Sequence, residues 1–337
     1  MKNKVFIIAE AGVNHNGSFD LAIRLCDIAK EAGADAVKFQ TFKTEKLLTK
    51  KAKLAEYQKN ALGETSDGQF DMIKKLELSY DQFGAIKEHC EKIGIEFMST
   101  PDDDDSLEFL VNLGIRRLKI GSAEITNVPF LRKFAKTGLP LIVSSGMADL
   151  IEVLAAKETL VKAGAKAEQL TFLHCNTEYP TPMRDVNLRA MLTMKEHLKT
   201  EIGYSDHTLG LTVCTAAAAL GATVLEKHFT IDTSMEGPDH QASLTPQQLK
   251  DLVQAVRDVE ICLGSDVKKA SPSEEKNKAI TRRLIVASRP IQKGEILSDE
   301  NLTTKRAPTG ISANQWDLVI GKKASKNYEE DESIFEH

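Results

Sequence analysis

Eight short apolar runs, separated by amphipathic stretches, constrain the fold of this chain more than any other feature of its sequence. The runs are rich in apolar and β-branched residues and end in polar ones, which is typical of buried parallel strands. The stretches between them place apolar residues at i, i+3, i+4 and i+7, the spacing of a helix with one buried face. The eight runs are VFIIAEAG, ADAVKFQTF, IEFMSTPD, RRLKIGSAE, LPLIVSSGM, LTFLHCNTEYP, TEIGYSDHT and ATVLEKHFT.

This alternation of strands and helices predicts an α/β fold, a (β/α)8 TIM barrel. An open doubly wound sheet usually has roughly five or six strands, so eight strand and helix units in about 265 residues fit a closed barrel better. In such a barrel the active site lies at the carboxyl ends of the strands. The polar residues that end the eight runs are therefore expected to meet in one cup.

His207 and His228 end the seventh and eighth runs, which are neighbouring strands of the predicted barrel. Neutral imidazoles on adjacent strand ends can share a divalent metal and leave positions open for water and substrate. A hydrogen-bonded structural role is the alternative for each histidine. Because both lie at equivalent strand ends in one cup, we favour the metal site.

Lys38 and Lys119 also end predicted strands. A buried lysine needs an anionic partner, so the two would form a site for phosphate, or for phosphate and carboxylate, together with nearby hydroxyl groups. The alternative is a structural ion pair, for example from Lys119 to Glu10 or Glu124. Those glutamates can act as acid/base groups or as counter-ions, and the residues alone leave both roles open. The hydroxyl groups belong to Thr100, Ser122, Ser144 and Ser205.

Asp102 to Asp105 form a run of four carboxylates directly after the third predicted strand. Acidic runs can bind metals, but this position is more typical of a solvated turn and a helix N-cap, where negative charge interacts favourably with the helix dipole. We therefore expect the run to begin a helix.

Composition and charge exclude several classes of protein. The chain has 337 residues, with 44 Lys and Arg against 49 Asp and Glu and a net charge of −5. No basic stripe with interleaved aromatic residues is present, so nucleic acid is not an expected partner. No apolar run approaches the roughly 20 residues that span a bilayer. The five cysteines are scattered and form no CxxC pair, which predicts reduced thiols and a cytoplasmic protein.

The pattern changes after Gly264, which divides the chain into domains. Residues 1–265 contain the predicted barrel, and residues 266–279 are polar and without period, as in a linker. Residues 280–337 contain short apolar runs and little helical pattern, which predicts a small β-rich domain. A domain of that size is marginally stable alone and is expected to pack against a barrel.

Nine motifs, in order and spacing, resemble the sialic acid synthases, which condense phosphoenolpyruvate with N-acetylmannosamine or a close relative. The resemblance covers nearly the whole chain, and the last domain resembles their C-terminal SAF (antifreeze-like) domain. The motifs are IIAEAGVNHNGS, DAVKFQTF, FMSTPD, KIGSAE, SSGM, HCNTEYPTP, GYSDHT, EKHFT and GPDHQASL.

The resemblance implies a role for each candidate residue. His207 and His228 would hold Mn2+ or Mg2+, and Arg306 of a partner subunit would reach the sugar's N-acetyl group, which implies a domain-swapped homodimer. Lys38, Thr100, Lys119, Ser122, Ser144 and Ser205 would bind phosphoenolpyruvate, with Thr177 at a further phosphate-binding position. Glu10, Gln40, Glu124, Tyr179 and Asp239 would face the sugar and the proton transfers, with Glu10, Lys38, Lys119 and Glu124 as the catalytic set.

The resemblance also implies the acceptor. It favours N-acetylmannosamine, which would give N-acetylneuraminate and phosphate. Legionaminate synthesis from 2,4-diacetamido-2,4,6-trideoxymannose is the alternative, because the two kinds of synthase share nearly all of these motifs. Another phosphoenolpyruvate-dependent sugar-acid synthase is a more remote alternative, since the last domain argues against it.

Overall fold

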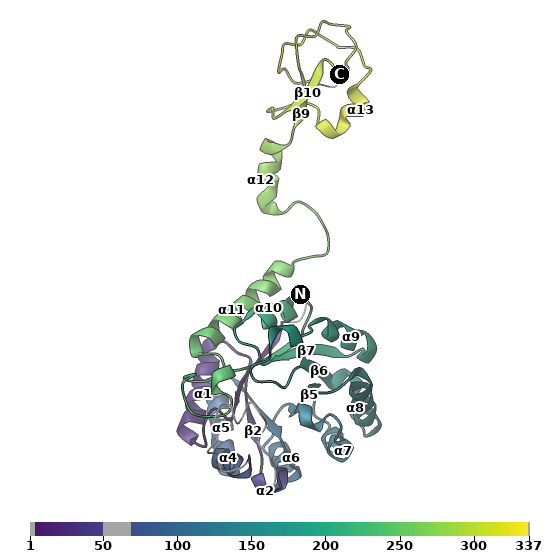
Figure 1. Ribbon diagram of the computed structural model, residues 1–337. Coiled ribbons are helices and arrows are strands. Elements are labelled where there is room, and N and C mark those ends of the chain that lie inside the picture. The colour runs from purple at the N-terminus through teal and green to yellow at the C-terminus, as the bar shows by residue number, and fades with distance from the viewer. Residues whose placement is uncertain (1–3, 50–68, 336–337) are drawn as a thin grey trace. The chain divides into compact units, whose positions relative to one another are not determined.

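The computed structural model describes residues 4–49 and 69–335 (Figure 1). The chain divides into two compact units, Met1–Gly264 and Ser265–His337. Each unit has a hydrophobic core of its own. Among the described residues, no helix combines the length and apolar character that crossing a membrane requires.

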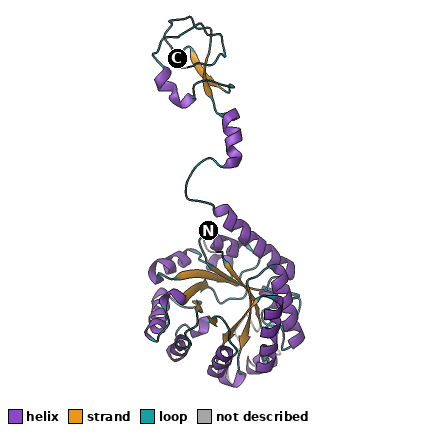
Figure 2. Cartoon of the chain, turned by 180° about the vertical axis from the view of Figure 1, so that it is seen from behind, coloured by secondary structure: helices purple, strands orange, loops and turns teal. Residues whose placement is uncertain are grey.

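The first unit is the predicted barrel of parallel strands. The strands follow the order β3-β2-β1-β8-β7-β6-β5-β4, and β3 lies beside β4 where the barrel closes. Helices surround the strands (Figure 2). All eight predicted runs form strands: β1 (Phe6–Gly12), β2 (Ala36–Thr41), β3 (Glu96–Pro101), β4 (Leu118–Ile120), β5 (Leu141–Ser144), β6 (Leu170–Cys175), β7 (Glu201–Asp206) and β8 (Val224–His228).

Local capping explains where the surrounding helices begin. Ser79 and Thr245 form capping boxes at α5 and α11, and Asp103 caps α6 by accepting the N–H of Ser106. The acidic run therefore begins a helix, as predicted. The helices are α1 (Phe19–Ala32), α2 (Thr44–Leu47), α4 (Gln69–Leu76), α5 (Tyr80–Ile93), α6 (Asp104–Asn112), α7 (Val128–Lys136), α8 (Leu150–Lys162), α9 (Arg189–Leu198), α10 (Thr212–Ala219) and α11 (Pro246–Leu263).

Along the strands, the side chains that point into the barrel change from apolar to polar toward the carboxyl ends. The apolar side chains form a small buried cluster. Because side chains two residues apart lie on the same face of a strand, the next inward residues form the floor of the cup. Ile8 is thus followed by Glu10, and Val224 by Glu226. The apolar layer consists of Ile8, Ala36, Met98, Ile142, Leu173 and Val224.

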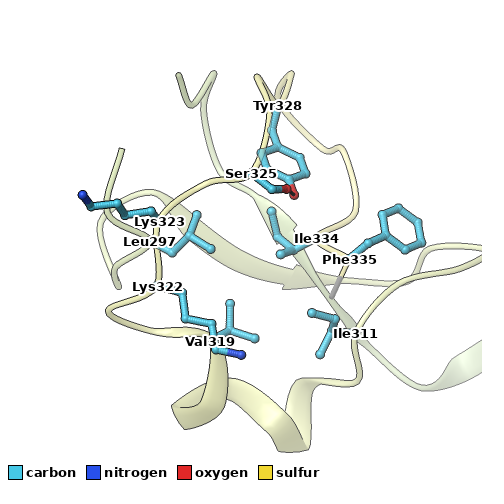
Figure 3. Close-up of a pocket in the computed structure, with 9 residues that line it drawn as sticks. All are labelled: Leu297, Ile311, Val319, Lys322, Lys323, Ser325, Tyr328, Ile334 and Phe335. Atoms are coloured by element: carbon cyan, nitrogen blue, oxygen red, sulfur yellow. Dashed lines mark hydrogen bonds between the residues drawn. The ribbon is translucent and has the colours of Figure 1, made fainter. Parts of the chain in front are cut away.

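The second unit corrects one expectation and contains a pocket. Residues 266–279 were predicted as an aperiodic linker, yet α12 (Pro272–Thr281) begins there with a capping box at Ser271. The unit then forms an antiparallel pair, β9 (Leu284–Ala287) and β10 (Leu302–Lys305), and the short α13 (Trp316–Val319). The unit contains a pocket of about 390 Å³. Figure 3 shows that aliphatic side chains, the rings of Tyr328 and Phe335, and the polar residues Lys322, Lys323 and Ser325 line it. Its described lining residues include no carboxylate and no histidine.

The close approach of β7 to β8 gives a test of the fold. A Cβ atom at Gly203 would lie 2.2 Å from the carbonyl oxygen of Val224. Gly203→Ala is therefore expected to push the strands apart and to lower the free energy of unfolding by about 1–3 kcal/mol. Gly84→Ala is the control, because that helical position has free space and alanine there should stabilise by up to about 1 kcal/mol. Urea denaturation measures both, and equal effects would contradict the close approach.

Candidate active site

Four buried charged side chains form the floor of the cup. Glu10, Lys38, Lys119 and Glu226 come from β1, β2, β4 and β8, and each is at most 4% exposed. Lys38 Nζ lies 2.8 Å from Glu10 Oε2 and 3.8 Å from Glu226 Oε2, and Lys119 Nζ lies 3.5 Å from Glu226 Oε1. Glu226 is therefore the carboxylate that the two lysines share.

Two hydroxyl groups belong to the same cluster. Thr100 Oγ1 accepts a hydrogen bond from Lys38 Nζ at 3.0 Å, and Ser205 donates to Glu226 Oε1 at 3.0 Å. Glu226 Oε2 has no hydrogen-bond partner among the described residues. The floor is thus an ion cluster in which one carboxylate oxygen of Glu226 is still able to accept a hydrogen bond.

Burial and charge set the protonation states of this cluster. Burial, reinforced by the negative charge of Glu226, raises the pKa of Glu10 to about 8 although Lys38 opposes the shift. The pKa of Glu226 is lowered, because Lys119 and Lys38 outweigh the effect of its burial. The pKa of Lys38 is raised, since Glu10 and Glu226 outweigh its burial. Lys38 therefore remains an ammonium group although it is buried, and Glu10 is the carboxyl that can take up a proton near neutral pH.

Further hydroxyl groups line the side of the cup formed by β4, β5 and β6. Ser122 Oγ accepts the backbone N–H of Gly146 at 3.0 Å and lies 3.2 Å from the sulfur of Cys175. A methyl group at Gly146 would come within 2.6 Å of Thr177, so Ser122 and Thr177 converge on this glycine. Ser144 Oγ is buried and has no hydrogen-bond partner among the described residues, so its hydroxyl group can donate to a ligand.

His207 and His228 lie together at the ends of β7 and β8, with their ring centroids 5.3 Å apart. His207 Nδ1 donates to the carbonyl oxygen of Asn176, which leaves Nε2 with its lone pair. His228 Nδ1 is buried and has no hydrogen-bond partner in the part of the chain that the structure describes, and Asp239 Oδ2 lies 3.9 Å from it. The ring of Tyr179 stacks on His207 at 4.0 Å.

The two imidazoles have the protonation state that metal ligation requires. Burial lowers the pKa of His207 to about 4 and that of His228 well below its usual value, so both rings are neutral at pH 7. Burial also raises the pKa of Asp239 to about 6. Within residues 4–49 and 69–335, no group of three or more His, Cys, Asp and Glu side chains is arranged to hold a metal ion. Neutral imidazoles are the form of histidine that ligates a divalent metal, and the cup holds this pair of them.

The remaining predicted residues lie away from the floor. Gln40 is half-buried on β2, two residues after Lys38 and on the same face of the strand. Glu124 is half-buried in the turn that follows β4 and accepts a hydrogen bond from Asn127. Arg306 is exposed and directly follows β10 in the second unit.

Sequence reasoning left two residues of the cup without a role. Glu226 was seen only as one of the polar residues at the end of its strand, although it precedes His228 by two and must share its face. Asp102 was assigned to the acidic turn, but its half-buried carboxyl lies close enough to Lys38 and Glu124 for their charges to act on it. Burial raises the pKa of Asp102 to about 7.

The shared role of Glu226 can be measured. Glu226→Gln leaves two buried ammonium groups without their common carboxylate, so the free energy of unfolding should fall by about 3–5 kcal/mol. Glu124→Gln is the control, because this rim residue has one neutral hydrogen-bond partner and should lose about 1 kcal/mol or less. Chemical denaturation at pH 7 gives both values. A loss below about 1 kcal/mol in Glu226→Gln would contradict the ion cluster.

Comparison with known proteins places the chain among synthases. It matches the NeuB family over residues 25–268 and the SAF domain over residues 282–337. It is 50% identical over 333 residues to the N,N'-diacetyllegionaminic acid synthase of Campylobacter jejuni, covering 99% of each chain. It is 49% identical to the enzyme of the same name from Legionella pneumophila, covering 96% of this chain and 91% of that protein.

More distant relatives also match most of the chain. The chain is 38% identical to human N-acetylneuraminate-9-phosphate synthase, covering 98% of this chain and 91% of that one. The crystal structure of an N-acetylneuraminic acid synthetase from Leptospira borgpetersenii, in complex with citrate, superposes with a TM-score of 0.71 at 34% identity, covering 82% of this chain and 90% of that one. Since the family match spans most of the barrel and these relatives align over nearly the full length, the chain belongs to the NeuB family and ends in a SAF domain.

Proposed function

We propose that this protein condenses phosphoenolpyruvate with 2,4-diacetamido-2,4,6-trideoxymannose to give N,N'-diacetyllegionaminate and phosphate. The observation that carries the condensation is the pair of buried lysines beside two neutral histidines in one cup. The choice of acceptor is supported by two relatives, 50% and 49% identical, that are named diacetyllegionaminic acid synthases. N-Acetylmannosamine, which the motifs alone favour, becomes the second candidate.

In the proposed reaction, C3 of phosphoenolpyruvate attacks the aldehyde carbon of the open-chain sugar and forms the new C–C bond. Water adds at C2, and the bond between C2 and the phosphate oxygen then breaks to release inorganic phosphate. The protein has to hold an anion, present an aldehyde to it and manage the protons. These tasks are assigned to three parts of the cup.

Lys38 and Lys119 bind the phosphoenolpyruvate anion on the floor. With the pKa of Glu10 raised to about 8, that carboxyl can remain protonated at neutral pH, so the two ammonium groups are opposed by Glu226 alone and the floor keeps a net positive charge. A bound anion then replaces solvent that the lysines lack. Hydroxyl donors complete this subsite: Thr100, Ser122, Ser144, Thr177 and Ser205.

Residues nearer the rim face the acceptor sugar. Gln40, Tyr179 and Asp239 offer hydrogen bonds to its hydroxyl and amide groups. Glu124 at the rim and Glu10 on the floor serve the proton transfers. Arg306 of a second copy reaches the N-acetyl group, so the active form is a domain-swapped homodimer. The reaction takes place in the cytoplasm, as the scattered cysteines of the sequence indicate.

His207 and His228 hold a divalent metal, Mn2+ or Mg2+, through their neutral rings. When bound, the metal supplies Lewis-acid polarisation of the aldehyde oxygen. Because only these two side chains would hold the metal, the cup would keep room beside their rings for substrate and water. Tyr179, stacked on His207, keeps that ring oriented toward the cup.

Phosphate release tests the condensation and the acceptor together. Phosphoenolpyruvate and Mn2+ are supplied with N-acetylmannosamine, its 6-phosphate or the diacetamido sugar, and we expect the diacetamido sugar to react at least about 10-fold faster. Treatment with a chelator should abolish release, and added Mn2+ should restore it. A preference for N-acetylmannosamine would make the protein an N-acetylneuraminate synthase. Silence with all three sugars would overturn the proposed condensation.

Mixing of two variants tests the swapped dimer. Arg306→Ala should raise KM for the sugar about 10-fold and leave KM for phosphoenolpyruvate within about twofold, because the arginine contacts only the sugar. Lys38→Met should be inactive. At a sugar concentration well below KM, where Arg306→Ala dimers are nearly inactive, dimers re-formed from equal amounts of both should recover about a quarter of wild-type activity, since half of the dimers are mixed and each has one intact site. The control is Lys293→Ala, an exposed cation of the same domain, which should change nothing. Absence of recovery would place Arg306 in its own subunit's site or outside it.

A further inference from the structure

A second ion pair lies behind the two histidines, on the outer side of β7 and β8. Asp206 Oδ2 and Lys227 Nζ are 2.7 Å apart, and their side chains are 0% and 1% exposed. The two residues are register partners in the β7–β8 ladder. Because side chains alternate along a strand, both point away from the cup while the residues before and after them point into it. The pair therefore lies at the level at which His207 and His228 enter the cup.

This pair also holds the turn that follows His207. The backbone N–H of Thr208 donates to Asp206 Oδ1 at 2.9 Å, and Lys227 Nζ donates to the carbonyl oxygen of Thr208. From α10, the thiol of Cys214 donates to Asp206 Oδ2 at 3.3 Å. Both neighbours of His207 are thus hydrogen-bonded to Lys227 of β8, and Asp206 is also hydrogen-bonded to α10. The ring of His207 is held separately, by its hydrogen bond to the carbonyl oxygen of Asn176.

Stability alone does not account for charges at this position. Two residues earlier in the same ladder, the outward-facing partners are Tyr204 and Leu225, which pack in the apolar layer between strands and helices. Replacing a buried ion pair by apolar residues is often neutral or stabilising, so packing would serve as well to join the strands. Directional hydrogen bonds provide what packing does not, a fixed angle and register for the groups they join.

We propose that Asp206 and Lys227 are positioning residues that set the geometry of His207 and His228 and so determine the affinity of the site for a divalent metal. This inference rests on the proposed function, in which the two histidines hold the metal. In this proposal the ion pair contacts neither substrate nor metal. Asp206 and Lys227 act through the backbone, because each directly precedes one of the two histidines.

Mn2+ binding to the full-length protein, measured without substrates by calorimetry and by the EPR signal of free Mn2+, tests the proposal. Asp206→Asn and Lys227→Met should each raise the Kd for Mn2+ at least 10-fold. The double variant Asp206→Asn/Lys227→Met leaves no unpaired buried charge and is the variant to use where a single substitution prevents folding. It should show the same loss, because the hydrogen bonds from Lys227 Nζ to Asp206 and to the carbonyl oxygen of Thr208 are gone.

A matched ion pair separates positioning from general stability. Asp35 and Arg257 are also 2.7 Å apart, but they lie at the amino ends of the strands, where Asp35 accepts the N–H of Ile7. Asp35→Asn should lower the Tm yet leave the Kd for Mn2+ within twofold of the wild type. Folded Asp206 variants that bind Mn2+ as the wild type does, while His207→Ala does not bind, would overturn the positioning role alone. A wild type that fails to bind Mn2+, or binds it equally well after His207→Ala, would overturn both the metal site and this inference.

Discussion

Two lysines inside the barrel can keep their charge at neutral pH because the ionised carboxylate of Glu226 lies within reach of both ammonium groups. Removing an ion from water costs several kcal/mol in a protein interior, and only close, hydrogen-bonded partners offset that cost. Lys38 and Lys119 share Glu226, and Lys38 has Glu10 as well. The strands β1, β2, β4 and β8 must therefore keep their register, since a shift of one residue would turn these side chains into the apolar layer outside the barrel. The charged floor thus depends on the barrel and also specifies its geometry.

Strands β7 and β8 serve different purposes on their two faces. Toward the cup, β7 and β8 present Ser205, Glu226 and the two histidines. Away from it, Asp206 and Lys227 join the strands by an ion pair, whereas Tyr204 and Leu225, two residues earlier in the ladder, pack by apolar contact. Gly203 allows the close approach that both faces need, because any side chain there would meet the backbone of β8. The spacing of the histidines is therefore fixed by backbone contacts as well as by side chains.

Strand positions could be predicted because parallel strands buried on both faces appear as short apolar runs, and the polar residue that ends each run reveals the cup. The histidines and lysines were found in this way. Pairing within the cup could not be predicted, because Glu226 meets Lys38 and Lys119 across strands that are far apart in the sequence. Helix α12 was missed for a different reason. Its polar residues show no buried face, although Ser271, Pro272 and Glu274 form a recognisable helix start.

The electrostatics of the cup also explain how an acidic chain could bind an anion. The net charge of −5 is spread over the whole molecule, and salt screens exposed charges beyond about 10 Å. Inside the barrel, water is largely excluded, so a single ammonium group at contact distance outweighs distant carboxylates. A proton on Glu10 would shift the floor toward positive charge, and ionisation of Glu10 above its pKa of about 8 would neutralise it. The proposed affinity for phosphoenolpyruvate therefore depends on one carboxyl group of the floor and not on the overall charge of the protein.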